Sequence, residues 1–242
     1  MLDTILFDLD GTLLPMDQDT FIKAYFQELC QKCSALGYPP DQIVQAVWKG
    51  TEAMVRNDGT KLNRDRFWDA FASLLGEEIR QAEELLDRFY SEEFHRVKSA
   101  TAPTPLAGEC VGILKNKGYR LVLATNPLFP PAGVHSRMRW AGIHPEDFDW
   151  ITHYENSHYC KPNPAYFGEI LDRIGKFPQD CLMVGNDAEE DTAAARLGCR
   201  VYLIRDCLEN RKGRDIAAYS GGSFEDFREL VRALPPVGNR KA

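Results

Sequence analysis

The chain has 242 residues, 44% of them hydrophobic and 27% charged, which suits one core domain with a smaller accessory domain. Its 29 Lys and Arg against 36 Asp and Glu give a net charge of −7, which argues against general binding to nucleic acid or an anionic membrane. The seven cysteines are scattered and odd in number, the opening residues lack a signal-peptide pattern, and no segment approaches the ~20 apolar residues of a membrane span. We therefore expect a cytoplasmic protein. Its oligomeric state is left open, and a monomer is compatible with the sequence.

The first predicted element is a buried strand over residues 4–9, TILFDL. Residues 16–97 then look helical, without a clear strand. The first helix of this segment has apolar residues at every fourth position, namely Phe21, Tyr25, Leu29 and Cys33. Three more helices are expected, and the last carries Ile79, Ala82, Leu86 and Phe89. We expect an all-helical domain over 16–97, inserted early in the chain.

From residue 98 onward, apolar strands alternate with helices. The strands are expected at 119–125, 149–152, 181–186 and 200–204. The helices are expected near 106–117, 131–141, 164–175 and 189–197, followed by a last helix capped by Ser223. This alternation predicts an α/β fold with a Rossmann-like, doubly wound parallel sheet. The core domain would consist of residues 1–15 and 98–242, with a frayed tail at 235–242.

Polar side chains follow the predicted strands at the points where they end. In a doubly wound sheet, ligands bind outside the carboxyl ends of the strands, so these side chains should gather there. They are Asp8, Asp10, Thr125, Asn126, Lys161, Asn186, Asp187 and Asp191. Carboxylates, a hydroxyl and an ammonium in one place fit metal-assisted phosphoryl transfer.

The chemistry assigns a role to each of these groups. An octahedral Mg²⁺ held by carboxylates neutralises a phosphate ester, so that Asp8 can serve both as metal ligand and as nucleophile. Asp10 is placed to protonate the leaving group and later to activate water. The Thr125 hydroxyl, the Asn126 backbone N–H and the Lys161 ammonium would hold the phosphoryl oxygens.

Four segments in this order, FDLDGT, ATN, KPNP and VGNDAEED, resemble the four motifs of the haloacid dehalogenase superfamily. The resemblance covers the whole predicted core, and the helical insert is similar to the family's C1 cap. It implies Asp8 as nucleophile, Asp10 as acid and base, and Thr125 and Lys161 as phosphate ligands. It also implies a Mg²⁺ cofactor contacted by the backbone carbonyl of Asp10. Haloalkanoate dehalogenases of the superfamily lack the second aspartate, so Asp10 favours a phosphatase.

The fourth motif departs from the common GDxxxxD pattern, because Asn186 stands where the first Asp often falls. Either Asp187 is the metal ligand, or Asn186 is a neutral ligand and Asp191 compensates. We favour Asp187, since Mg²⁺ prefers carboxylates.

We expect a Mg²⁺-dependent phosphatase that acts on a small phosphorylated metabolite through an aspartyl-phosphate. A phosphomutase of the same superfamily is the alternative among enzymes. A catalytically silent binding or regulatory protein is the alternative outside them. Four residues of the insert could face the substrate and set specificity, namely Trp48, Lys49, Arg56 and Asn57.

Overall fold

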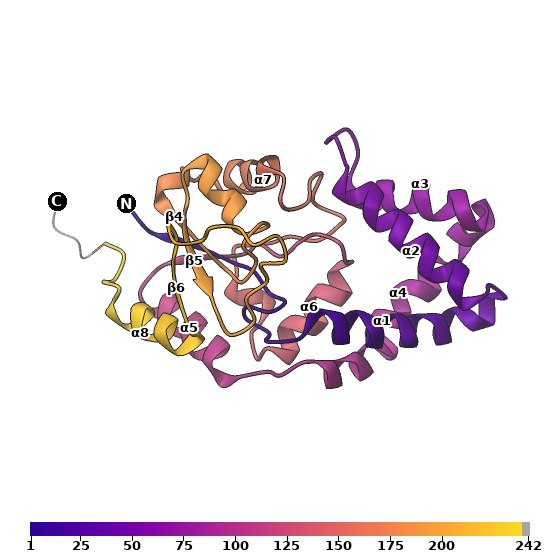
Figure 1. Ribbon diagram of the computed structural model, residues 1–242, viewed down its shortest axis with the longest axis horizontal. Helices are drawn as coiled ribbons and strands as arrows, with labels where there is room; N and C mark the ends of the chain where they lie inside the picture. The colour runs from indigo at the N-terminus through magenta and orange to yellow at the C-terminus, as the bar shows by residue number, and fades with distance from the viewer. Residues whose placement is uncertain (239–242) are drawn as a thin grey trace.

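The computed structural model describes residues 1–238 and contains one parallel sheet beside a group of helices (Figure 1). The strand order across the sheet is β3-β2-β1-β4-β5-β6, which confirms the predicted parallel α/β fold. The strands are β1 (Thr4–Phe7), β2 (Arg120–Leu123), β3 (Trp150–Ile151), β4 (Cys181–Gly185), β5 (Arg200–Ile204) and β6 (Ser220–Gly222). The central strand β1 pairs with β2 and β4, so their carboxyl ends lie together.

Helices cover both faces of the sheet. Successive side chains of a strand point to opposite sides, so each strand contributes to two cores. On one face, Ile5 and Phe7 share a core with α5 (Pro105–Asn116), α6 (Pro131–Trp140) and α8 (Phe224–Ala233). On the other face, Leu6 packs with α7 (Pro164–Ile174) and the short 3₁₀ helix η6 (Thr192–Leu197). This two-sided burial explains the nearly continuous apolar runs of the strands.

The cap is the all-helical segment between β1 and α5, and it lies beside the sheet, away from both chain ends (Figure 1). Its elements are α1 (Gln18–Cys33), η1 (Ser34–Leu36), α2 (Pro40–Val55), α3 (Asn63–Leu75), η2 (Glu77–Ala82), α4 (Glu83–Glu92) and η3 (Phe94–Ala100). Buried apolar residues of the cap and of the sheet form one continuous cluster. The cap is therefore packed against the core.

The chain enters and leaves the cap at one place. The backbone N–H of Ala102 donates to the carbonyl of Pro15 at 2.8 Å. Met16 and Thr101 form an isolated antiparallel bridge directly beyond this pair. The two connections between cap and core thus run side by side.

Several elements differ from the sequence predictions. The expected fourth cap helix is split into η2 and α4, and the expected helix at 189–197 is the 3₁₀ helix η6. The structure also adds β6, which the sequence SGG did not indicate because small residues have little strand propensity. Among the strands of residues 1–238, it lies at the edge of the sheet and pairs only with β5.

The C-terminal tail differs as well. The prediction of a frayed end is wrong for its first residues, since Tyr119 Oη donates to the Pro235 carbonyl and Val237 N donates to the Lys117 carbonyl. Residues 239–242 lie outside the described part. Within residues 1–238, none of the helices has the length and apolar character that a bilayer crossing requires.

Candidate active site

The loop that follows β1 places Asp8 at the carboxyl end of the central strand. Asp8 N donates to the Val184 carbonyl at 2.9 Å, which extends the pairing of β1 with β4. The chain then turns at Gly11, whose φ is +84°, a conformation that side chains other than glycine rarely adopt. A Cβ at Gly11 would also lie only 2.3 Å from Nδ2 of Asn186. The glycine of the first motif therefore allows two polar strand ends to approach each other.

Lys161 lies between two carboxylates. Its Nζ is 2.8 Å from Oδ1 of Asp8 and 2.7 Å from Oδ1 of Asp191, and its side chain is fully buried. Burial opposes the charge of Lys161, but Asp191 and Asp8 raise its pKa well above the usual value. Burial raises the pKa of Asp8 to about 7, against the attraction of Lys161 and with the repulsion of Asp191. An ammonium thus faces the expected nucleophile in a site shielded from water.

The fourth motif is a tight turn organised by its own carboxylates. Asp191 Oδ2 accepts a hydrogen bond from Asp187 N at 2.9 Å. Asp187 Oδ1 accepts from the backbone N–H groups of Glu189 and Glu190, at 2.7 and 2.8 Å. A Cβ at Gly185 would lie 2.0 Å from Asp191 Oδ2, so this position excludes any side chain. The turn holds Asp191 against Lys161.

Asn126 joins the second strand end to this turn. Its Nδ2 donates to Glu190 Oε1 at 3.0 Å, and its Oδ1 accepts from the backbone N–H of Lys161 at 3.2 Å. Burial raises the pKa of Glu190 to about 8, although Lys161 opposes the shift. The neighbouring Thr125 is buried and, like Asn126, lines the cavity described below. The residues expected to hold the phosphate therefore converge.

Arg137 is a residue of this site that the sequence analysis missed. It comes from α6 and is fully buried, with Nη1 3.3 Å from Oδ2 of Asp10. Its guanidinium carbon lies 4.0 Å from the centre of the Phe129 ring, a cation–π contact. Burial raises the pKa of Asp10, while Arg137 opposes the rise. No motif marks this arginine, and only the fold brings it to Asp10.

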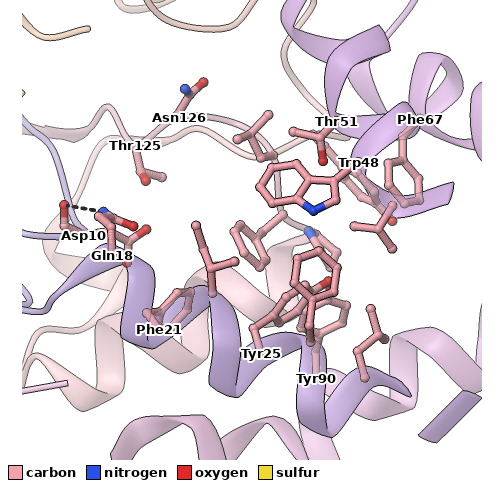
Figure 2. Close-up of a pocket in the computed structure, with 18 of the residues that line it drawn as sticks. Asp10, Gln18, Phe21, Tyr25, Trp48, Thr51, Phe67, Tyr90, Thr125 and Asn126 are labelled. Carbon is pink, nitrogen blue, oxygen red and sulfur yellow. Dashed lines mark hydrogen bonds between the residues drawn. The ribbon is translucent and has the colours of Figure 1, made fainter. Parts of the chain in front are cut away.

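Two of the side chains expected to hold a metal, Asp8 and Asn186, meet at the Thr12 hydroxyl. Thr12 Oγ1 is 2.9 Å from Oδ1 of Asn186 and 3.2 Å from Oδ2 of Asp8. The Asp10 carbonyl accepts a hydrogen bond from Gln18 Nε2 at 3.4 Å (Figure 2). Within residues 1–238, no group of three Asp, Glu, His or Cys side chains alone could bind a metal. The donors that do meet are a carboxylate and an amide oxygen, and both are ligand types that Mg²⁺ accepts.

A cavity of about 370 Å³ opens from these carboxylates into the cap. Thr125 and Asn126 lie on its core side, and Trp48, Tyr25 and Tyr90 lie on its cap side (Figure 2). The cavity joins the candidate catalytic groups to the inner face of the cap.

Of the four cap residues considered from the sequence, only Trp48 lines the cavity. Arg56 is exposed and pairs with Glu52, and Lys49 is exposed. Asn57 is buried and donates to the Lys61 carbonyl and to Asn63 Oδ1. Its contacts hold a loop of the cap together.

Comparison with known families gives a match between residues 2–198 and the model of the haloacid dehalogenase-like hydrolases. The chain belongs to this family. The match covers the cap and the core through η6, and it confirms the resemblance carried by the four motifs. The later strands β5 and β6 complete the sheet of this family member.

Two curated relatives and a solved structure extend the comparison. This haloacid dehalogenase-like hydrolase is 28% identical over 202 residues to a phosphoglycolate phosphatase of Vibrio parahaemolyticus, covering 82% of this chain and 81% of the relative. It is 29% identical over 245 residues to a glyceraldehyde 3-phosphate phosphatase of Methanothermobacter thermautotrophicus, covering 97% and 100%. A HAD phosphatase of Thermococcus onnurineus has the same fold, with a TM-score of 0.61, 22% identity and coverage of 98% and 100%. These matches confirm the expected class, a hydrolase of phosphoric monoesters.

Proposed function

We propose that this protein is a Mg²⁺-dependent phosphatase that hydrolyses a small phosphomonoester through an aspartyl-phosphate on Asp8. The observation that carries the proposal is the contact of Lys161 Nζ with Asp8 Oδ1, 2.8 Å long and buried at the end of the central strand. An ammonium held there can neutralise charge on a phosphoryl group at Asp8. The names of the relatives support a small phosphorylated metabolite as substrate.

The proposed reaction has two steps. In the first, an oxygen of Asp8 attacks phosphorus, the ester P–O bond breaks, and Asp10 donates its proton to the leaving oxygen. In the second, Asp10 removes a proton from water, the water oxygen attacks phosphorus, and the Asp8 carboxylate leaves with release of inorganic phosphate. Thr125, Asn126 and Lys161 would hold the phosphoryl oxygens throughout.

Support for the proposed metal site comes from the Thr12 hydroxyl, which contacts both Oδ2 of Asp8 and Oδ1 of Asn186. Mg²⁺ would be held by the Asp8 carboxylate, the main-chain carbonyl of Asp10 and the side chain of Asn186 or Asp187, with Asp191 holding the turn. When bound, the ion would neutralise the charge of the phosphate and of Asp8. Neutralisation matters here because burial raises the pKa of Asp8, whereas a nucleophilic carboxylate must be ionised.

We also infer a cytoplasmic location. Its support is that all seven cysteines are free in the structure, as expected in a reducing compartment.

The direct test replaces the nucleophile. Asp8→Asn should abolish Mg²⁺-dependent release of phosphate from p-nitrophenyl phosphate, while Asp149→Asn, a change in an exposed ion pair with Arg120, should keep wild-type activity. Asp10→Asn should slow the second step, so that mass spectrometry detects a phosphoryl group on Asp8. Full activity of Asp8→Asn would disprove the assignment.

A further inference from the structure

The cavity at the candidate active site has two chemically different ends. Its core end carries Asp8, Asp10 and the other acidic groups of the strand ends. Its cap end is formed mainly by apolar and aromatic side chains, which lie around a common space in Figure 2. A volume of about 370 Å³ lies in the usual range of small-molecule sites. The cap end is therefore where the part of a substrate beyond its phosphate would lie.

All four main cap helices contribute to this apolar end. Phe21 and Tyr25 of α1, Trp48 of α2, Phe71 of α3 and Leu86 of α4 each line it. The spacing of Phe21 and Tyr25 puts both side chains on one helix face. Trp48 is 49% exposed, an unusual exposure for so large an apolar side chain. Helix faces that could have been closed by packing instead surround a space.

The polar groups at this end do not supply a cation for a second anion, since Thr51 and Trp68 contribute only a neutral hydroxyl and a neutral indole N–H. The hydroxyls of Tyr25 and Tyr90 lie 2.9 Å apart and satisfy each other. Asp87 lines the same end and would repel a carboxylate. Among the lining residues, all within 1–238, Arg211 is the only Lys or Arg, and it pairs with Glu209 at 2.9 Å and Asp19 at 3.1 Å.

From these observations, and resting on the proposed phosphatase function, we infer that the preferred substrates are phosphomonoesters of apolar alcohols, with alkyl or aromatic leaving groups. The phosphate would bind at Asp8, and the apolar group would fill the space bounded by Phe21, Trp48 and Phe71. Burying apolar surface there is favourable, whereas burying a carboxylate without a cation is costly. A carboxylated substrate such as phosphoglycolate would be disfavoured.

A homologous series of n-alkyl phosphates tests this inference. From ethyl to hexyl phosphate the leaving alcohols have similar acidity, so differences in rate report binding of the chain. We expect kcat/KM to rise roughly threefold for each added methylene until the space is filled, mainly through KM. The kcat/KM for hexyl phosphate should also be higher than that for phosphoglycolate. A flat or falling series, or a preference for phosphoglycolate, would overturn the inference.

Variants of Trp48 sharpen the test. Trp48→Ala should flatten the dependence of kcat/KM on chain length, because one wall of the apolar end is removed. Trp48→Arg should reduce the ratio of kcat/KM for hexyl phosphate to kcat/KM for phosphoglycolate at least tenfold, since the new side chain supplies a cation. Phe177→Ala is a matched control, because Phe177 is 69% exposed and does not line the cavity. It should leave the series unchanged, and an equal flattening in this control would count against the inference.

A binding measurement separates this inference from the proposed function. Calorimetry with Asp8→Asn and Mg²⁺ compares hexylphosphonate with phosphonoacetate, which has a carboxylate in place of the alkyl chain. Tighter binding of hexylphosphonate supports the apolar site, even if no ester is hydrolysed and the phosphatase proposal fails. Equal or tighter binding of phosphonoacetate refutes the apolar site, whatever the enzyme hydrolyses.

Discussion

The fully buried Arg137 guanidinium forms an ion pair with the partly buried Asp10 carboxylate, with Nη1 3.3 Å from Oδ2. Arg137 does not line the cavity, so it would act on the reaction only through Asp10. The Phe129 ring covers the guanidinium on one side. Arg137 is thus a positioning residue whose charge opposes the effect of burial on Asp10.

Replacing Arg137 should change the pH dependence of turnover. In Arg137→Gln the attraction that lowers the pKa of Asp10 is lost while burial, which raises it, remains, so the pKa rises. At saturating Mg²⁺, the apparent pKa that Asp10 contributes to the pH dependence of kcat should therefore rise. Arg137→Lys should raise it less. Urea denaturation should show that Arg137→Gln lowers the free energy of unfolding by about 3 kcal/mol, because the Asp10 carboxylate is left without its buried cation. An unchanged apparent pKa would show that the pair is merely structural.

Replacing Lys161 should impair both activity and stability. Lys161→Met leaves Asp8 and Asp191 buried without the ammonium that lies between them. We expect kcat/KM for p-nitrophenyl phosphate to fall by at least about 100-fold. Lys176→Met is the control, since it removes only a partly exposed ion pair with Asp3. It should lower the free energy of unfolding by no more than about 1 kcal/mol. Comparable activity losses in the two variants would contradict the role of Lys161.

The metal-free protein should lose stability at Glu190 as the pH rises. The unfolded chain ionises Glu190 near a pH of about 4.3, whereas burial raises its pKa in the folded protein to about 8. Between these values the folded state binds the extra proton, so the Glu190 contribution to the free energy of unfolding decreases with rising pH, by at most about 1.4 kcal/mol per pH unit.

The measurement is urea denaturation in EDTA at several pH values for the wild type and Glu190→Gln. Subtracting the two curves removes the other titrating groups, and the difference should fall toward high pH. Glu189→Gln serves as control, because Glu189 pairs with Lys212 and its pKa is lowered instead. A difference curve for Glu190 that rises with pH would show that its folded pKa is not raised.

The metal ligand of the fourth motif can be identified by magnesium titration of activity. Because Asn186 and Asp8 share the Thr12 hydroxyl, we expect Asn186→Ala to raise the half-saturating Mg²⁺ concentration about tenfold. Asn186→Asp should lower it, since a carboxylate is added. Asp187→Asn removes a charge but keeps an acceptor for the turn, and should have the smaller effect. A larger effect at Asp187 would support the ligand favoured from the sequence.

The sequence was sufficient to predict the residues that follow the strands, for a physical reason. Parallel strands deliver their carboxyl ends to one edge, so Asp8, Asn126 and Asp187 had to approach one another once the strands were recognised. The departure of Asn186 from the usual pattern was also visible.

Other parts of the site depend on packing that no local pattern reports. Arg137 lies on a helix whose sequence gives no sign of Asp10, and Glu190 meets Asn126 only through the turn of the fourth motif. The helical periodicity of α1 indicated a buried face. It did not distinguish a face packed against other helices from one that lines a cavity.

The pairing of Pro15 with Ala102 has a consequence for the history and engineering of this chain. Because the two ends of the cap meet, a short turn from Pro15 to Ala102 would close the sheet domain without stretching any strand, and another helical module could be inserted at the same point. The groups proposed to break the ester bond all lie outside that junction, whereas most of the apolar walls lie inside it. Reaction chemistry and substrate preference can therefore be exchanged as separate parts.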